Sequence, residues 1–171
     1  PTTSYTATVT DTVSSITMGN TPKTNYKYNE PLDTTGGTLT ITRASGETKT
    51  VDITNAMITS TFDPQTLGEQ TLTVTYGGQT TTYTVTVKDY VTGITVSPTE
   101  VDGTYNQELA DLINNKNIKY TVNYAKAGAL QPVAPTENMV TGYNKTDLNA
   151  RNITITYTDN DSQSATNGET F

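Results

Sequence analysis

One stretch of the sequence occurs twice, and this internal repeat constrains the fold more than any other feature. Residues 4–18 align without gaps on residues 82–96, at an offset of 78. Further matches, at offsets of 82 and 81, join Thr54–Thr59 to Thr136–Thr141 and Leu67 to Leu148. Self-similarity at a fixed spacing is typical of repeated structural units. The sequence therefore predicts one element that recurs roughly every 80 residues.

Hydrophobic residues alternate with threonine along most of the repeated segments. Alternation with period two is typical of strands that bury one face, and β-branched threonine suits the exposed face of a pleated sheet. Gly77-Gly78 separates two such runs by the two residues of a tight hairpin turn. The residues predicted to face inward are Tyr5, Ala7, Val9, Leu39, Ile41, Leu72, Val74, Tyr76, Tyr83, Val85, Val87, Ile118, Tyr120, Val122, Tyr124, Ile153, Ile155 and Tyr157. We therefore predict an all-β chain of two antiparallel β-sandwiches in tandem.

The repeat also predicts the domain boundaries. Residues 1–10 have the pattern of the last strand of a preceding repeat, residues 11–89 form the first sandwich, and residues 90–171 form the second, without its last strand. The first strand, with Tyr5, Ala7 and Val9 on one face, is then without a partner, and an unpaired strand exposes a hydrogen-bonding edge. The unpaired strand at the start of the sequence has two interpretations. The chain is a segment of a longer array, or this strand is exchanged into the second sandwich of another copy.

The second sandwich is expected to depart from the first in two places. Thr104 and Gln107 have the spacing of a capping box, and the apolar residues that follow have helical spacing, which predicts a short helix over Asn106–Asn114. Ala125–Pro135 is rich in Gly, Pro and Ala and predicts an irregular loop. This loop is either a passive surface segment or a contact loop, since binding residues concentrate on loops. Its candidate contact residues are Ala125, Lys126, Leu130, Gln131, Pro132 and Pro135.

Composition excludes several classes of function. The chain has no His and no Cys, so it can form no Ser-His-Asp or Cys-His catalytic system, no zinc site built from those residues and no disulfide. Ten basic against seventeen acidic residues give a net charge of −7, which argues against nucleic-acid partners. No stretch approaches the roughly 20 apolar residues of a membrane-spanning helix. The eleven Tyr could stack on sugars, but most lie at predicted inward positions.

Acidic residues in turns are the only candidates for metal binding. Asp159-Asn160-Asp161-Ser162-Gln163 alternates oxygen-bearing side chains, but it lacks the Gly and the terminal Glu of an EF-hand loop. A polar hairpin turn is the favoured interpretation. Asp11 and Asp89 recur at equivalent positions before each sandwich, where a structural role in a turn is favoured over a calcium site. We therefore predict no catalytic residue, no metal site and no cofactor.

The order of motifs along residues 12–88 points to a known family. These motifs are Ile16-Thr17-Met18, Tyr26-Lys27-Tyr28-Asn29-Glu30-Pro31-Leu32, Gly36-Gly37-Thr38-Leu39-Thr40-Ile41, Ser45-Gly46, Asn55-Ala56-Met57 and Thr66-Leu67-Gly68-Glu69. In this order they resemble the bacterial immunoglobulin-like (Ig-like) domains of group 3. Residues 90–171 match less well, because Asn149 replaces the equivalent of Gly68 and the helix and the loop intervene.

The resemblance implies an Ig-like fold for both sandwiches and a bacterial protein at the cell surface, in the cell wall or secreted, in which such domains form arrays. We therefore expect a non-catalytic structural or stalk segment that projects distal parts from the cell. The first alternative is an adhesin or carbohydrate-binding module that uses the Ala125–Pro135 loop. The second is a self-assembling subunit of a surface lattice or filament. The expected partners are neighbouring Ig-like repeats, copies of this chain, or a glycan or protein at a surface.

Overall fold

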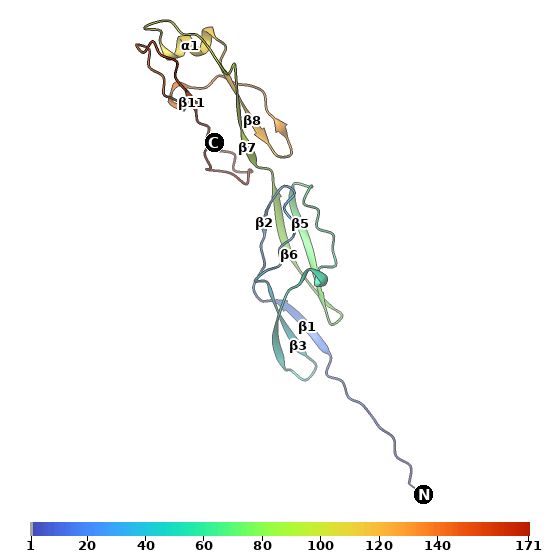
Figure 1. Cartoon of the computed structure of the whole chain (residues 1–171). Helices are drawn as coiled ribbons and strands as arrows, with labels where there is room; N and C mark the ends of the chain where they lie inside the picture. Colours follow the sequence, from blue (N-terminus) through green and yellow to red (C-terminus); the bar gives the residue numbers. More distant parts are fainter. Residues whose placement is uncertain (1) are drawn as a thin grey trace. The chain divides into compact units, whose positions relative to one another are not determined.

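The structure of this protein is a computed structural model, and it describes residues 2–171. The chain divides into two compact units, the first ending at Val87 and the second beginning at Lys88 (Figure 1). The sequence repeat predicts a boundary after Asp89. The first unit holds two three-stranded antiparallel sheets. One has the order β1 (Val13–Met18), β3 (Thr38–Arg43), β4 (Thr48–Asp52), and the other has the order β2 (Asn25–Lys27), β6 (Gln79–Lys88), β5 (Gly68–Tyr76). A single turn of 3₁₀-helix, η1, spans Asn55–Met57.

The β5–β6 hairpin has the tight turn that Gly77-Gly78 predicts. Both glycines have positive φ, 57° and 82°, as the favoured two-residue hairpin turns require. Gly77 is also constrained by its surroundings, because a Cβ atom there would lie 2.6 Å from Cγ2 of Val13. Tyr76 pairs with Gln79 across the turn, and this register sets Leu72 opposite Tyr83.

The alternating residues of the first unit form its core. Leu39, Ile41, Leu72, Val74, Tyr83, Val85 and Val87 are buried together with Ile16, Tyr26 and Ile53. The Tyr26 ring lies 5.0 Å from that of Phe62, and its hydroxyl contacts the carbonyl oxygens of Lys23 and Asp33, each at 3.0 Å. The prediction of an inward-facing apolar stripe is confirmed for these strands. Tyr76 is the exception, since it is only half-buried.

The segment before β1 forms no strand, although its alternation predicts one. Residues 2–10 have no regular secondary structure, and Tyr5 and Val9 expose 92% and 94% of their surface. Ala7 is exposed as well. The physical reason is that a strand needs a partner for its backbone groups, and within the described part of the chain no strand pairs with this segment.

The second unit has smaller sheets than the first. Its three-stranded sheet has the order β7 (Val91–Ser97), β8 (Lys119–Tyr124), β9 (Gly128–Ala129), and its two-stranded sheet pairs β10 (Val140–Thr141) with β11 (Thr154–Ile155). A 3₁₀ turn, η2, spans Glu137–Met139. Val91, Leu112, Ile113 and Val122 are buried, whereas Ile153 is 38% exposed. The predicted all-β fold of antiparallel sheets with one short helix is confirmed.

The helix begins three residues later than predicted. α1 spans Leu109–Asn115 rather than Asn106–Asn114. Asn106 has φ 66°, a left-handed conformation that no α-helix accommodates. Half of the predicted capping box is still present, because the backbone N–H of Thr104 donates to Oε1 of Gln107 at 2.9 Å. That contact closes the turn before the helix instead of capping its first residue.

The predicted loop Ala125–Pro135 is mostly a hairpin. Residues 125–127 turn the chain from β8 into β9, and Val133 then forms a bridge with Tyr120 of β8. Pro135 is buried. The sequence did not predict the short strand β9, because Gly and Ala lack the alternation of apolar and polar residues that marks a strand. In the described residues, no helix is long and apolar enough to cross a membrane.

Candidate functional site

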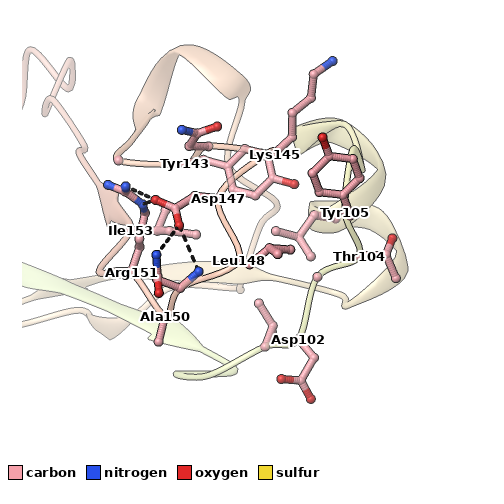
Figure 2. Close-up of a pocket in the computed structure, with 16 residues that line it drawn as sticks. Asp102, Thr104, Tyr105, Tyr143, Lys145, Asp147, Leu148, Ala150, Arg151 and Ile153 are labelled. Atoms are coloured by element: carbon pink, nitrogen blue, oxygen red, sulfur yellow. Dashed lines mark hydrogen bonds and ion pairs between the residues drawn. The ribbon is translucent and has the colours of Figure 1, made fainter.

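A pocket of about 340 Å³ opens on the second unit, and we call it the second-unit pocket (Figure 2). Three segments line it: Val101–Tyr105, which precedes α1, then Gly142–Lys145 and Asp147–Arg151, which connect β10 to β11. Leu112 of α1 and Ile153 complete the lining. The pocket therefore lies between two stretches of irregular chain that come from distant parts of the unit.

The first wall is held by the turn around Asn106. The backbone N–H of Asn106 donates to the carbonyl of Lys145 at 2.8 Å, which joins the two walls. Gln107 closes the turn on Thr104 through both its backbone and its side chain, at 3.0 and 2.9 Å. Asparagine tolerates the left-handed conformation that this geometry requires.

The second wall is organised by the carboxylate of Asp147. Its Oδ1 accepts the backbone N–H and the side-chain amide of Asn149 at 2.9 and 2.8 Å. Its Oδ2 pairs with the guanidinium of Arg151, toward which it is turned in Figure 2. The chain before it is folded by Asn144, whose Oδ1 accepts from the backbone and the hydroxyl of Thr146 at 3.1 and 2.9 Å. Asp147 thereby fixes the shape of this wall.

The floor of the pocket is apolar. A Cβ atom placed on Gly103 would lie 3.6 Å from Cδ1 of Leu112, an ordinary van der Waals contact, so this leucine packs next to Gly103. Leu112 is only 2% exposed. The Tyr143 hydroxyl donates to the carbonyl of Gln107 at 2.7 Å and so spans the pocket from one wall to the other.

The two basic side chains that line the pocket are held in ion pairs. Lys145 pairs with Glu108, as Arg151 does with Asp147. Large apolar side chains at its edge are exposed: Tyr105 by 66% and Leu148 by 83%. Exposed apolar side chains at the edge of a pocket are suited to binding a ligand by burial. In residues 2–171 no group of three or more acidic side chains is arranged to hold a metal ion.

The acidic turn at Asp159 forms a buried network. The Asp159 side chain is fully buried and accepts from Oγ1 of Thr166 at 2.8 Å and from the backbone N–H of Asp161 at 3.0 Å. Oγ1 of Thr166 in turn accepts the backbone N–H of Val91 at 2.9 Å. Burial opposes the charge on Asp159, but the hydrogen bonds from Ser164, Asp161 and Thr166 outweigh it and lower the pKa of the carboxyl. The sequence predicted a polar turn here, but nothing in it indicated that Asp159 is buried.

Asp11 and Asp89 hold the turns of two hairpins. Asp11 accepts from the backbone and the hydroxyl of Ser45, in the β3–β4 turn, at 3.0 and 2.9 Å. Asp89 accepts the backbone N–H groups of Lys126 and Ala127, in the β8–β9 turn, at 2.9 Å each. This geometry favours the structural role that sequence analysis preferred for both residues.

The predicted contact loop lies away from the second-unit pocket. The backbone N–H of Ala125 donates to Tyr90 and that of Leu130 donates to Val122, each at 2.9 Å, so both residues belong to the hairpin. The side chains of Lys126, Leu130, Gln131 and Pro132 are exposed. The structure does not bring Tyr5, Ala7 or Val9 into any site. The pocket itself was not predicted, although Asn149, at the position equivalent to Gly68, marked a departure from the first unit.

Known proteins resemble part of this chain. Residues 20–87 match the family model of the bacterial Ig-like domain (group 3). A solution structure described as that of a candidate surface protein is 23% identical over 58% of this chain and 100% of its own length, with a TM-score of 0.30. No curated protein matches the sequence. The family match falls within residues 12–88, where the motifs predicted it, so residues 20–87 of the first unit are similar to the bacterial Ig-like domains of group 3.

Proposed function

We propose that this chain is a non-catalytic structural segment, a stalk, of a bacterial surface protein, built from two repeats of one Ig-like unit. The family match over residues 20–87 supports the assignment to a bacterial Ig-like protein. The observation that carries the proposal further is that the same local contacts occur in both units. Repeating a unit lengthens a protein and spaces its ends apart, because each unit buries its own core and adds its own length to the array.

The hairpin turns give the first pair of repeated contacts. Asp11 and Asp89 each hold the turn of a hairpin, as described above. Next to them, the backbone N–H of Ala44 donates to the carbonyl of Thr12, and that of Ala125 donates to the carbonyl of Tyr90, both at 2.9 Å. These contacts make β1, β3 and β4 the counterparts of β7, β8 and β9.

The turns at Asn29 and Asn106 give the second pair. Both residues have positive φ, 64° and 66°, and their N–H groups donate to Pro64 and Lys145 at 2.9 and 2.8 Å. Glu30 and Gln107 then close equivalent turns with side-chain contacts of 2.8 and 2.9 Å. The two turns share both their geometry and the sequence Tyr-Asn, Tyr28-Asn29 and Tyr105-Asn106, and both likenesses support a repeat.

A stalk must stay folded in water and under load at the outside of a cell. The exposed faces of the strands are rich in threonine, and the net charge of −7 disfavours association between neighbouring molecules. Because the chain has no cysteine, no disulfide contributes to its stability, which comes from the cores and the hydrogen bonds of the units. We place the segment at the cell surface, in the cell wall or in a secreted protein, next to further Ig-like repeats.

Single-molecule pulling from the two ends of the chain tests this role. We expect two discrete unfolding events, each lengthening the chain by roughly 270 Å for a unit of about 80 residues. The strands of a mechanical element should resist force, so the events should stand clearly above the featureless extension of an unfolded chain. Extension without discrete events would contradict the stalk role.

A further inference from the structure

The second unit has a long turn where the first unit has a tight one. In the first unit, Gly77-Gly78 alone joins β5 to β6. In the second unit, the corresponding pair is Tyr157 and Phe171, whose N–H groups donate to each other's carbonyls at 2.9 and 2.8 Å. Between them lies Thr158–Thr170, which we call the expanded turn. Two residues are enough to reverse a chain between paired strands, so the reversal itself does not explain the added length.

The expanded turn has a polar interior. Of the four buried polar residues that the structure describes, three belong to this turn: Asp159, Ser164 and Thr166. Oδ2 of Asp159 accepts from Oγ1 of Thr166 at 2.8 Å, and the two hydroxyl oxygens of Ser164 and Thr166 lie 2.9 Å apart. The backbone N–H of Gly168 donates to the carbonyl of Asp159 at 2.7 Å. Buried polar groups are tolerated when they are hydrogen-bonded, and these bonds hold the turn in one shape.

This turn is bonded to the segment that opens the second unit, Lys88–Val91, which we call the connector. The buried backbone N–H of Val91 donates to Oγ1 of Thr166 at 2.9 Å. The backbone N–H of Ala165 donates to the carbonyl of Asp89 at 2.7 Å. In Figure 1 the expanded turn, in dark red, accordingly lies beside the start of β7. A donor and an acceptor of the connector backbone are therefore both satisfied by one distant turn.

The connector also makes contacts that the two units share. The backbone N–H of Ala125 donates to the carbonyl of Tyr90, and the carboxylate of Asp89 accepts from Lys126 and Ala127. These donors lie in the β8–β9 turn, and the β3–β4 turn of the first unit holds Asp11 and Thr12 in the same way. The expanded turn therefore adds a second set of contacts to a segment that one hairpin already holds.

The first unit satisfies the same carbonyl by other means. The counterpart of Asp89 is Asp11, whose carbonyl accepts from the guanidinium of Arg43 at 2.8 Å. The registers of β1 with β3 and of β7 with β8 make Tyr124 the counterpart of Arg43. The Tyr124 hydroxyl lies 3.5 Å from Oδ1 of Asp159. In the second unit, the expanded turn thus makes the contact that a side chain makes in the first.

We propose that the expanded turn is a brace that keeps the connector folded with the second unit and protects it from proteases. Segments between domains are ordinarily exposed and flexible, and they are preferred sites of cleavage. Here the contacts begin at the first residue of the unit, since the ammonium group of Lys88 donates to the carbonyl of Ser162 at 3.1 Å. A protease must release these bonds before it can bind the connector in an extended form. This inference does not depend on the stalk role.

Trypsin tests the brace directly, because it cleaves after lysine and Lys88 begins the connector. Thr166→Val keeps the shape of the side chain but removes the hydroxyl, so the buried N–H of Val91 loses its acceptor. Cleavage of the folded chain after Lys88 should become about tenfold faster, because it follows the population of the opened segment. Hydrogen exchange of the Val91 amide should become faster by a similar factor.

Thr170→Val is the matched control for this substitution. It makes the same chemical change in the same turn, but Thr170 is exposed and its hydroxyl contacts only that of Thr158, at 3.1 Å. Cleavage after Lys88 should keep the rate of the unaltered chain. Neither substitution alters the residues next to Lys88 that trypsin recognises. Equal cleavage rates in the two variants would overturn the proposal.

A second variant removes the brace as a whole. Gly-Gly in place of Thr158–Thr170 gives the second unit the turn of the first. The β7–β8 pairing does not use the expanded turn, so the amides of Ile94 and Val122 should stay protected from hydrogen exchange while cleavage after Lys88 accelerates. Cleavage at the original rate would show that the turn does not protect the connector. Loss of protection at Ile94 and Val122 would show that the turn belongs to the core of the unit, and would also overturn the proposal.

Discussion

At the scale of single residues, two buried tyrosines of the first unit have opposite hydrogen-bonding states. The Tyr26 hydroxyl contacts the carbonyl oxygens of Lys23 and Asp33 at 3.0 Å. In the part of the chain that the structure describes, the Tyr83 hydroxyl is buried and has no hydrogen-bond partner. Burial raises the pKa of Tyr83 to about 12, so this hydroxyl stays protonated in neutral solution. A buried polar group without a partner destabilises the folded state.

We expect Tyr83→Phe and Tyr26→Phe to change stability in opposite directions. Tyr83→Phe removes an unpaired hydroxyl and should leave the free energy of unfolding unchanged or raise it by up to about 1 kcal/mol. Tyr26→Phe leaves backbone carbonyls without their partner and should lower it by about 1–2 kcal/mol. Chemical unfolding at neutral pH measures both variants against the unaltered chain. A loss of stability in both would show that the Tyr83 hydroxyl does find a partner in solution.

The buried carboxylate of Asp159 should make the second unit sensitive to acid. Hydrogen bonds lower its pKa in the folded state, so its contribution is fully present above the ordinary carboxyl pKa and is lost as pH falls through the lowered value. Asp159→Asn removes charge-assisted hydrogen bonds and should lower the free energy of unfolding by about 2 kcal/mol at neutral pH, with a smaller effect in strong acid. Unfolding at both pH values tests this, with Asp102→Asn, at an exposed residue, as the control. An effect of Asp159→Asn that is equal at the two pH values would contradict the assignment.

At the scale of elements, α1 compensates for a side chain that the second unit lacks. In the repeat proposed above, in which Asn106 corresponds to Asn29, Gly103 takes the position of Tyr26, which is almost fully buried in the core of the first unit. The Leu112 side chain reaches this position from α1. Leu112→Ala should therefore destabilise the second unit by about 2–4 kcal/mol and leave the first unit unchanged. Hydrogen exchange resolved by segment measures the two units separately, and Asn115→Ala, at an exposed position of the same helix, should have little effect.

A strand could be predicted from the sequence where its hydrophobic alternation coincides with a partner strand in the structure. Leu72, Val74, Val85 and Val87 alternate and also have a partner strand, so the predicted faces are confirmed. Residues 4–10 alternate in the same way, but a single sequence does not say whether a partner is present. The helix start was wrong because the conformation of Asn106 depends on its bond to Lys145, which is distant in the sequence.

The second-unit pocket could be predicted only in part. Asn149, at the position equivalent to Gly68, indicated a departure from the first unit, but not its consequence. The depth of the pocket depends on how Leu112 and the Asp147 turn fill the space, and such packing is set by long-range contacts. The burial of Asp159 has the same origin, because Thr166 and Val91 approach it from distant parts of the unit.

At the scale of the whole molecule, the two units differ in how much apolar surface they bury. The core of the first unit contains ten buried apolar residues, whereas four are buried in the second. Buried apolar area is the main source of folding free energy, and units with separate cores unfold as separate transitions. We therefore expect calorimetry to show two transitions, with the second unit unfolding at the lower temperature.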